Sequence, residues 1–488
     1  MSLSFTNGLT AARPVRGLLP LCAGTAAYLL ATFLGDALLH DSDTLWQIKV
    51  GQWIIDHHAV PSSDLYSFTR LGEPWISSAW LSQALYALVY SKLGWAGPVV
   101  LSSLAVGITF AIFVWLCEAY FEPAHSILVA ILALILSCPH FLARPHMLAL
   151  PLMVAWVGAM ISAADRRGAP SLLLLPLMAL WANLHGGFVL GLAVIAPIAL
   201  IAVWDAAPER RIALIGRWAV FAVAALAASC CTPYGWDTLF AAAKILDLGQ
   251  VLSTISEWRP ADFGSFGLFE ACILGLMGLA LYRGIVLSLP RILLLLLLAH
   301  MALAHVRSID AFALLFPLVL AKPLAGEEKP AGFARDRMRW PPSLISLFAS
   351  GAIAVGGWAS TLSYVAHHQF AFASTQTPAA AVDILKKRQA KRIFNAYEFG
   401  GYLIARDVPT FIDGRAELYG EKFIMDYYTA TGGPGVDGLL PLLDEYRIDA
   451  TLLTPASPAA KLLDHVRGWQ RLYADSTAVI HVRTEGAK

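Results

Sequence analysis

Long apolar runs recur along this sequence from residue 17 to about residue 365, with short polar connections between them. An apolar run of about 20 residues is long enough to cross the hydrocarbon core of a bilayer as a helix. Charged residues make up only 14% of the chain, against about 25% in ordinary soluble domains. The sequence therefore predicts an α-helical polytopic membrane protein that contacts membrane lipids over much of its surface.

The lengths of these runs predict about eleven transmembrane helices. They cover residues 17–39, 97–119, 125–141, 147–163, 171–185, 187–204, 213–231, 266–283, 290–305, 309–323 and 342–364. Positive charges gather before the first span and after the fourth, sixth, eighth and tenth, which is one side of the membrane. The clusters are Arg13 and Arg16, Arg166 and Arg167, Arg210 to Arg217, Arg283 and Arg291, and Lys322 to Arg339. Since cytoplasmic loops carry the excess of positive charge, we expect a cytoplasmic N-terminus and an extracytoplasmic C-terminus in a bacterial inner membrane.

The composition changes at about residue 365. Residues 1–365 form the predicted transmembrane domain, whose long outer loops are 40–96 and 232–265. Residues 366–488 carry a larger share of the charge and alternate strand-like with helical stretches, which predicts a small extracytoplasmic α/β domain. The strand-like runs are 392–395, 408–412, 450–453 and 478–482.

Two classes of interaction are excluded by composition. The formal net charge is +1, which gives no basis for nucleic acid as a partner. The six cysteines all lie within or beside apolar runs and are expected to pack as small hydrophobic side chains. The sequence therefore predicts neither a disulfide framework nor a zinc site.

A pair of acids follows the first predicted span directly. Asp41 and Asp43 fall where lipid tails meet water, and acids in that position point to function because they are costly there. They could hold a divalent cation or supply a general base, since both uses require carboxylate oxygens. Alternatively, Asp43 and Thr44 cap the amphipathic helix that continues through Trp46. Capping accounts for one of the acids but not for both of them together with His40.

This arrangement resembles the GT-C superfamily of membrane glycosyltransferases. The shared features are a first span that ends in an acidic pair, then an amphipathic helix and a long outer loop. Enzymes of that superfamily use polyprenyl-phosphate or polyprenyl-diphosphate sugars as donors. The resemblance implies that Asp43, assisted by Asp41, is the catalytic or metal-binding acid, with Mg²⁺ or Mn²⁺ as a candidate cofactor. It also implies a polyprenyl-linked sugar donor as a partner, and an acceptor that the sequence does not identify.

A second likeness lies after the last span. The segment Asn395–Tyr402 resembles the WWDYG motif of the oligosaccharyltransferase catalytic subunit, with an acid between aromatic residues and glycine after them. The tryptophan pair is absent, so recognition of an acceptor peptide is not carried over. The likeness places Tyr397 and Glu398 on the acceptor side. Asp413 and Arg415, in the next loop, are added to that side, with an ordinary turn carrying a solvated ion pair as the alternative.

Two arginines at the outer ends of spans are candidates for binding the donor phosphate. The guanidinium groups of Arg307 and Arg144 can each match phosphate oxygens with two parallel hydrogen bonds. The alternative is that they anchor their helices at the membrane surface. His185, between two apolar helices, is a third phosphate candidate or else a satisfied histidine in a tight helical hairpin. Arg259 is expected to pair with Glu257 or Asp262.

Together these features favour a membrane glycosyltransferase that moves a sugar from a polyprenyl-linked donor to an acceptor at the outer face of the cytoplasmic membrane. One alternative is a transporter or flippase, because Glu270 and His300 lie inside apolar runs and transporters place ionisable groups near the midplane. The other is a non-catalytic membrane scaffold for envelope polysaccharide assembly. The polar residues gather toward one face of the membrane, which favours the transferase.

Overall fold

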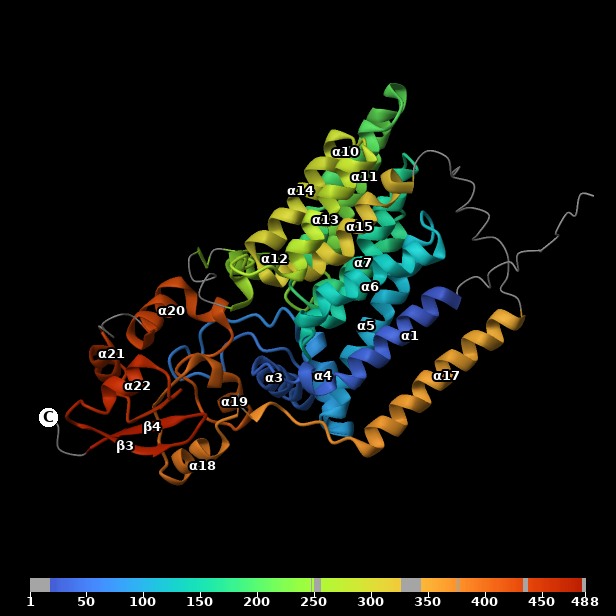
Figure 1. The fold of residues 1–488 in the computed structure, drawn as a ribbon. Coiled ribbons are helices and arrows are strands. Elements are labelled where there is room, and N and C mark those ends of the chain that lie inside the picture. Colours follow the sequence, from blue (N-terminus) through green and yellow to red (C-terminus); the bar gives the residue numbers. More distant parts are fainter. Residues whose placement is uncertain are drawn as a thin grey trace, which may run out of the picture.

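The computed structural model describes residues 18–246, 248–249, 256–325, 344–374, 377–432 and 438–484. Within these ranges the chain forms a bundle of apolar helices with a small α/β domain at one end (Figure 1). The basic residues Arg13 and Arg16, and those between residues 326 and 343, lie outside the described residues.

The bundle helices coincide with the predicted apolar runs. They are α1 (Leu18–Phe33), α5 (Ala96–Cys117), α6 (Pro123–Ser137), α7 (Pro145–Asp165), α8 (Leu175–Leu184), α9 (Phe188–Ala193), α10 (Ile195–Trp204), α11 (Pro208–Ser229), α13 (Leu268–Arg283), α14 (Leu289–Ala304), α15 (Ile309–Ala325) and α17 (Leu344–His367). Among the described residues, five helices are long and apolar enough to cross a membrane, and others are apolar but shorter. The prediction of eleven spans is therefore not confirmed as a count.

Small residues allow the first bundle helices to pack closely. α1 and α5 meet at Gly24 and Gly107, where a Cβ added to Gly24 would lie 2.6 Å from the Gly107 carbonyl oxygen. Close backbone approach at small residues is the usual basis of helix packing in membranes, because lipid gives helices no hydrophobic reason to associate.

Short helices connect the bundle to the small domain. They are α2 (Gly35–Leu38), α3 (Asp43–His57), α4 (Trp80–Leu93) and α12 (Asp237–Leu246), with one-turn helices η1 (Cys138–His140), η2 (Leu172–Leu174), η4 (Ser256–Trp258) and η5 (Val306–Ser308). The amphipathic helix predicted after the acid pair is α3. Trp46, Val50 and Ile54 form the buried face of α3 and pack with Trp75 and with Ile404 of the small domain. α3 therefore contributes to both parts of the molecule (Figure 1).

The small domain is an α/β fold, as predicted. Its helices are η7 (Tyr397–Phe399), α18 (Ala379–Lys387), α19 (Gly400–Ala405), α20 (Ala416–Gly432), α21 (Leu439–Glu445) and α22 (Pro458–Leu463), and its strands are β1 (Ile393–Asn395), β2 (Ala450–Leu453), β3 (Trp469–Ala474) and β4 (Val479–Arg483). The strand order is β1-β2-β4-β3, with β1 parallel to β2 and the other pairs antiparallel.

One predicted strand is wrong, and the contact that this segment makes instead bears on the site. Residues 408–412 do not join the sheet but pair with the first outer loop, where Thr410 N–H donates to the Tyr66 carbonyl at 3.1 Å. Pro409 has no N–H to donate to a central sheet, which disfavours a strand at this position. The backbone pairing instead ties the small domain to the loop that carries the acid pair.

Candidate active site

The guanidinium of Arg144 joins the two acids of the first loop. Its Nη1 lies 2.8 Å from Asp41 Oδ2, and its Nη2 lies 2.7 Å from Asp43 Oδ2. The turn before α7 is held in place because the Thr44 hydroxyl donates to the Ala143 carbonyl at 3.1 Å. Two predicted site elements about a hundred residues apart therefore form one charged group.

Every carboxylate oxygen of the acid pair has a partner. Asp43 Oδ1 accepts from Trp46 Nε1 at 3.0 Å, and Asp41 Oδ1 accepts from the Asp43 backbone N–H at 2.8 Å. Asp41 therefore satisfies a backbone donor at the start of α3, a role that the capping interpretation assigned to Asp43. The Asp43 side chain instead faces Trp46 and Arg144.

A third acid links Arg144 to Arg307. Glu257, in η4, forms an ion pair with Arg144, and its Oε2 lies 4.0 Å from Arg307 Nη1. The Arg307 guanidinium also lies 4.4 Å above the Trp258 ring. Glu257 thus pairs with Arg144 and approaches Arg307 instead of forming the expected pair with Arg259. Asp43 and Arg307 belong to one connected cluster.

His185 lies beside this cluster. Its ring centroid is 6.3 Å from that of His146, and its Nδ1 accepts from the Gly187 backbone N–H at 3.0 Å. Burial lowers the pKa of His185 well below its ordinary value, and His146, Arg307 and Arg144 lower it further. His185 is therefore neutral beside the arginines, with Nδ1 satisfied by the glycine turn.

The acids of the cluster have different proton affinities. Burial raises the pKa of Asp43 to about 7 against the opposing charge of Arg144, and Asp41 and Glu257 add to the increase. Burial also favours neutral Glu257, but Arg144 and Arg307 hold the pKa of Glu257 below its ordinary value. A carboxyl that titrates near neutrality is suited to exchange a proton with a substrate. Asp43 is that carboxyl.

Two glycines of the small domain lie against the acid loop. A Cβ added at Gly401 would overlap the Ser42 carbonyl oxygen, and one added at Gly414 would overlap the Asp43 carboxylate. The absence of a side chain at these positions lets the small domain contact the loop between Asp41 and Asp43 directly. The small domain therefore forms one wall of the site.

A buried ion-pair group holds the Gly414 loop. Arg415 Nη2 lies 2.7 Å from Asp413 Oδ2, and Arg415 Nη1 lies 2.6 Å from Asp64 Oδ1 in the first outer loop. All three side chains are 0% exposed, so the expected solvated pair is replaced by a buried one. Tyr419 donates a further bond to Asp413 at 2.7 Å. Asp413 and Arg415 thus fix this loop from within the protein, and neither side chain is exposed.

Tyr397 and Glu398 occupy different surroundings. Tyr397 is partly buried. Burial raises the pKa of Tyr397 well above its ordinary value, and the charge on nearby Asp43 raises it further. Glu398 is exposed on the small domain. The structure therefore places Tyr397, and not Glu398, beside the cluster.

The acid pair does not fit a divalent cation in this arrangement. Among the described residues, no group of three or more His, Cys, Asp or Glu side chains lies close enough to hold a metal ion. Each oxygen of Asp41 and Asp43 already accepts from Arg144, Trp46 or the α3 backbone. Arg144 supplies a positive charge where a cation would bind.

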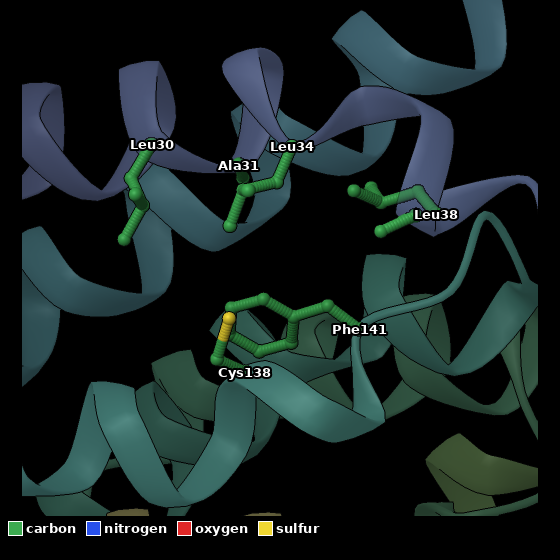
Figure 2. Close-up of a pocket in the computed structure, with 7 residues that line it drawn as sticks. Leu30, Ala31, Leu34, Leu38, Cys138 and Phe141 are labelled. Atoms are coloured by element: carbon green, nitrogen blue, oxygen red, sulfur yellow. The ribbon is translucent and has the colours of Figure 1, made fainter.

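An apolar pocket lies beside the acid loop. Figure 2 shows Leu30, Ala31 and Leu34 on one side, with Cys138 and Phe141 facing them. Leu38 also lines the pocket, and its carbonyl accepts from the Ala143 N–H, one residue before Arg144. Leu30 and Leu34 are both more than 40% exposed, so the pocket is bordered by apolar side chains that face outward from the bundle.

The fold has counterparts among solved structures. The Archaeoglobus fulgidus oligosaccharyltransferase in the apo form has a TM-score of 0.51 at 10% identity, over 97% of this chain and 75% of that chain. AglB from the same organism, in complex with an inhibitory peptide and a dolichol-phosphate, has a TM-score of 0.50 at 11% identity, over 95% and 74%. ArnT from Cupriavidus metallidurans bound to undecaprenyl phosphate has a TM-score of 0.50 at 11% identity, over 95% and 98%.

The chain shares the fold of these oligosaccharyltransferase and ArnT structures. The resemblance inferred from the acid loop is confirmed at the level of the fold, in a protein whose structural neighbours are polytopic membrane enzymes. No protein-family model matches the chain, and no curated protein matches it by sequence. At 10–11% identity the likeness describes the fold, so the chemistry must be argued from the cluster itself.

Two contributors to this site are not among the residues that the sequence predicts. Glu257 was assigned to the neighbouring Arg259, because nothing in a linear pattern brings a second-loop acid to Arg144. Gly414 lies between the predicted residues Asp413 and Arg415. A glycine flanked by two charged residues is a weak signal that another part of the chain approaches the backbone closely. Glu270 and His300, which favoured transport, lie on α13 and α14, and His300 is exposed.

Proposed function

We propose that this protein is a membrane glycosyltransferase that moves a sugar from a polyprenyl-linked donor to an acceptor hydroxyl at the outer face of the cytoplasmic membrane. The observation that carries the proposal is the single cluster in which Arg144 contacts Asp41, Asp43 and Glu257 while Arg307 lies beside Glu257. It places a carboxyl suited to proton transfer next to cations suited to phosphate.

The arginines account for donor binding and for the leaving group. When the bond between the anomeric carbon and the phosphate oxygen breaks, the electron pair remains on the lipid phosphate. Arg307 and Arg144 are positioned to stabilise that charge with hydrogen bonds from their guanidinium groups, as fixed donors do at sites of developing charge. His185, which is neutral beside them, contributes polarity without adding charge.

Asp43 can accept the proton that the acceptor hydroxyl loses. The acceptor oxygen forms its bond to the anomeric carbon as its proton passes to the Asp43 carboxylate, which balances the step. The pKa of Asp43, about 7, suits a general base near neutral pH. Asp41 assists by holding Arg144 and the start of α3, and the small domain limits the acceptor side through Gly401 and Gly414.

The apolar pocket is too small, at about 30 Å³, to enclose a polyprenyl chain, but the outward-facing side chains around it are suited to contact the lipid part of the donor. Leu30 and Leu34 line one side of the pocket and face outward, and Phe141 lines the other side (Figure 2). Phe141 precedes Arg144 by three residues in the same turn. The neighbours solved with dolichol-phosphate and with undecaprenyl phosphate support a polyprenyl carrier. A lipid entering sideways from the bilayer would bring its phosphate to the arginines.

The test measures release of undecaprenyl phosphate from undecaprenyl-phosphate hexoses by mass spectrometry, using purified protein in liposomes with membrane extract as the acceptor source. We expect Asp43→Asn to lower the rate by roughly 10²–10⁴-fold, the usual contribution of a general base. Asp41→Asn should lower it less. The control is Asp426→Asn, an exposed acid of α20 that pairs with Lys422. Transfer by both acid variants at the wild-type rate, with normal insertion, would refute the proposal.

A further inference from the structure

A cleft of about 400 Å³ lies where α3 meets the small domain, away from the charged cluster. Residues of α3 and α19, which lie side by side in Figure 1, line the cleft together with residues of the first outer loop. Its lining includes Lys49, Trp53 and His57 of α3, Tyr66 of the first outer loop and Asp407 of the small domain. This volume lies within the range of about 300–1,000 Å³ that small-molecule sites occupy.

An aromatic pair forms part of the cleft wall. The rings of Trp53 and His57 are stacked, with centroids 4.3 Å apart and planes 16° from parallel. They are four residues apart on α3, so the helix holds both rings on the same face. A flat, rigid surface of this kind suits a ligand that has an apolar face and polar edges.

Polar side chains surround the aromatic pair. Lys49 Nζ lies 2.6 Å from Asp407 Oδ1, and Gln52 Nε2 donates to Asp56 Oδ1 at 2.7 Å. Asp407 is 73% exposed and Lys49 is 32% exposed, so both retain capacity for further hydrogen bonds. The rim therefore offers both hydrogen-bond donors and acceptors. It carries two carboxylates, Asp56 and Asp407, and one ammonium group, Lys49.

Tyr66 contributes a hydroxyl that the protein leaves unused. Its Oη is buried and has no hydrogen-bond partner within the part of the chain that the structure describes. Its ring is fixed by the Arg415 guanidinium, 5.3 Å from the ring centroid, and its carbonyl accepts from Thr410 N–H. A buried polar atom without a partner can be satisfied by a water or by a ligand in the adjoining cleft.

We propose that this cleft is a saccharide-binding site for an uncharged glycan. A sugar ring presents C–H groups on its face and hydroxyls at its edges, which matches the Trp53–His57 stack and the polar rim. The excess carboxylate at the rim disfavours an anionic ligand, and the rim polarity disfavours an alkyl chain. Binding here does not depend on the proposed transfer chemistry.

The position of the cleft suggests what the bound glycan does. Lys49 follows Asp43 by six residues on the same helix, which corresponds to about 9 Å along the α3 axis. The cleft thus holds glycan outside the reacting centre, on the same rigid element that carries the base. If the proposed function holds, the acceptor is a saccharide that is anchored here while its reacting hydroxyl lies elsewhere.

The experiment measures binding of cellobiose, lactose and N,N′-diacetylchitobiose by saturation-transfer difference NMR, with full-length protein in nanodiscs free of sugar-based detergent. We expect at least one disaccharide to bind, and Trp53→Ala to weaken that binding roughly tenfold. Tyr66→Phe keeps the ring and removes only the hydroxyl, so it should weaken binding a few-fold. Trp204→Ala, an exposed tryptophan at the end of α10, is the matched control.

Each result bears on the proposal. Binding of none of the disaccharides, or equal binding by wild type and Trp53→Ala, would overturn it. Tighter binding of 3′-sialyllactose than of lactose would overturn the preference for an uncharged glycan. Asp43→Asn should bind the disaccharide as wild type does while failing to transfer sugar. Absence of transfer by the wild-type protein, with intact disaccharide binding, would instead refute the transferase and leave the cleft assignment standing.

Discussion

Gly414 of the small domain lies so close to Asp43 of the first outer loop that an added Cβ would overlap the Asp43 carboxylate. The contact joins residues from opposite parts of the chain, and the buried Arg415 beside Gly414 anchors it to Asp64. The position of the proposed base therefore depends on how the small domain docks. Changes far from the reacting atoms should affect the reaction through this contact.

Gly414→Ala tests that dependence. The new methyl group must displace the Asp43 carboxylate or the loop, and an error of about 1 Å in a catalytic group can cost roughly 10²-fold in rate. We expect turnover to fall by about that factor while the protein remains folded, measured by release of undecaprenyl phosphate and by size-exclusion profile. Gly432→Ala has nothing within 4 Å of the added Cβ and is the matched control. Equal effects of both substitutions would contradict this role.

The pH dependence of transfer should follow the ionisation of Asp43. Since a base must be ionised to accept a proton, and burial raises the pKa of Asp43 to about 7, kcat/KM should rise as pH increases through about 7 and then level off. Asp41→Asn removes a negative charge that favours the protonated form, so the rising limb should move to lower pH. A limb that stays unchanged in this variant would argue against Asp43 as the titrating group.

Glu257→Gln should strengthen donor binding. Glu257 pairs with Arg144 and lies beside Arg307, so its carboxylate competes with a lipid phosphate for the same cations. A hydrogen bond to a charged group is worth about 1.5–3 kcal/mol, so we expect roughly tenfold tighter binding of undecaprenyl phosphate. Binding is measured by native mass spectrometry, with Glu209→Gln at the start of α11 as the control. Weaker binding would show that Glu257 helps to hold the donor.

Arg415→Met should destabilise the protein. The substitution leaves Asp64 and Asp413 buried without their cation, and breaking a buried pair typically costs about 3–5 kcal/mol. The exposed pair of Arg406 and Asp383 provides the comparison, because Arg406→Met should cost about 1 kcal/mol or less. Thermal unfolding of the purified proteins distinguishes the two. Similar losses would mean that the buried group does not secure the small domain.

Chelation should leave transfer unchanged. The oxygens of Asp41 and Asp43 are already occupied by Arg144, Trp46 and the α3 backbone, so we propose that guanidinium supplies the positive charge of the site. The rate of undecaprenyl phosphate release is compared with and without excess EDTA. A loss that Mg²⁺ or Mn²⁺ restores would show that a cation displaces Arg144 in the working enzyme.

Local chemistry made part of this protein predictable. Apolar runs mark the bundle helices because only long apolar segments are stable in hydrocarbon. The positions of α5 and α7 therefore follow from the apolar runs 97–119 and 147–163. The α/β character of the small domain follows from alternating patterns, although β3 was not predicted and residues 408–412 pair with the first loop instead. A strand's partner depends on tertiary contacts that propensity does not encode.

The position of the acid pair was predictable from the sequence, because Asp41 and Asp43 stand where an apolar run ends. Their partners were decided only by the tertiary structure. Arg144, Glu257 and Gly414 come from three distant segments, and folding alone brings them to the acid loop. The proton affinity of Asp43 was decided there as well, since burial and neighbouring charges set it and both are properties of the assembled site.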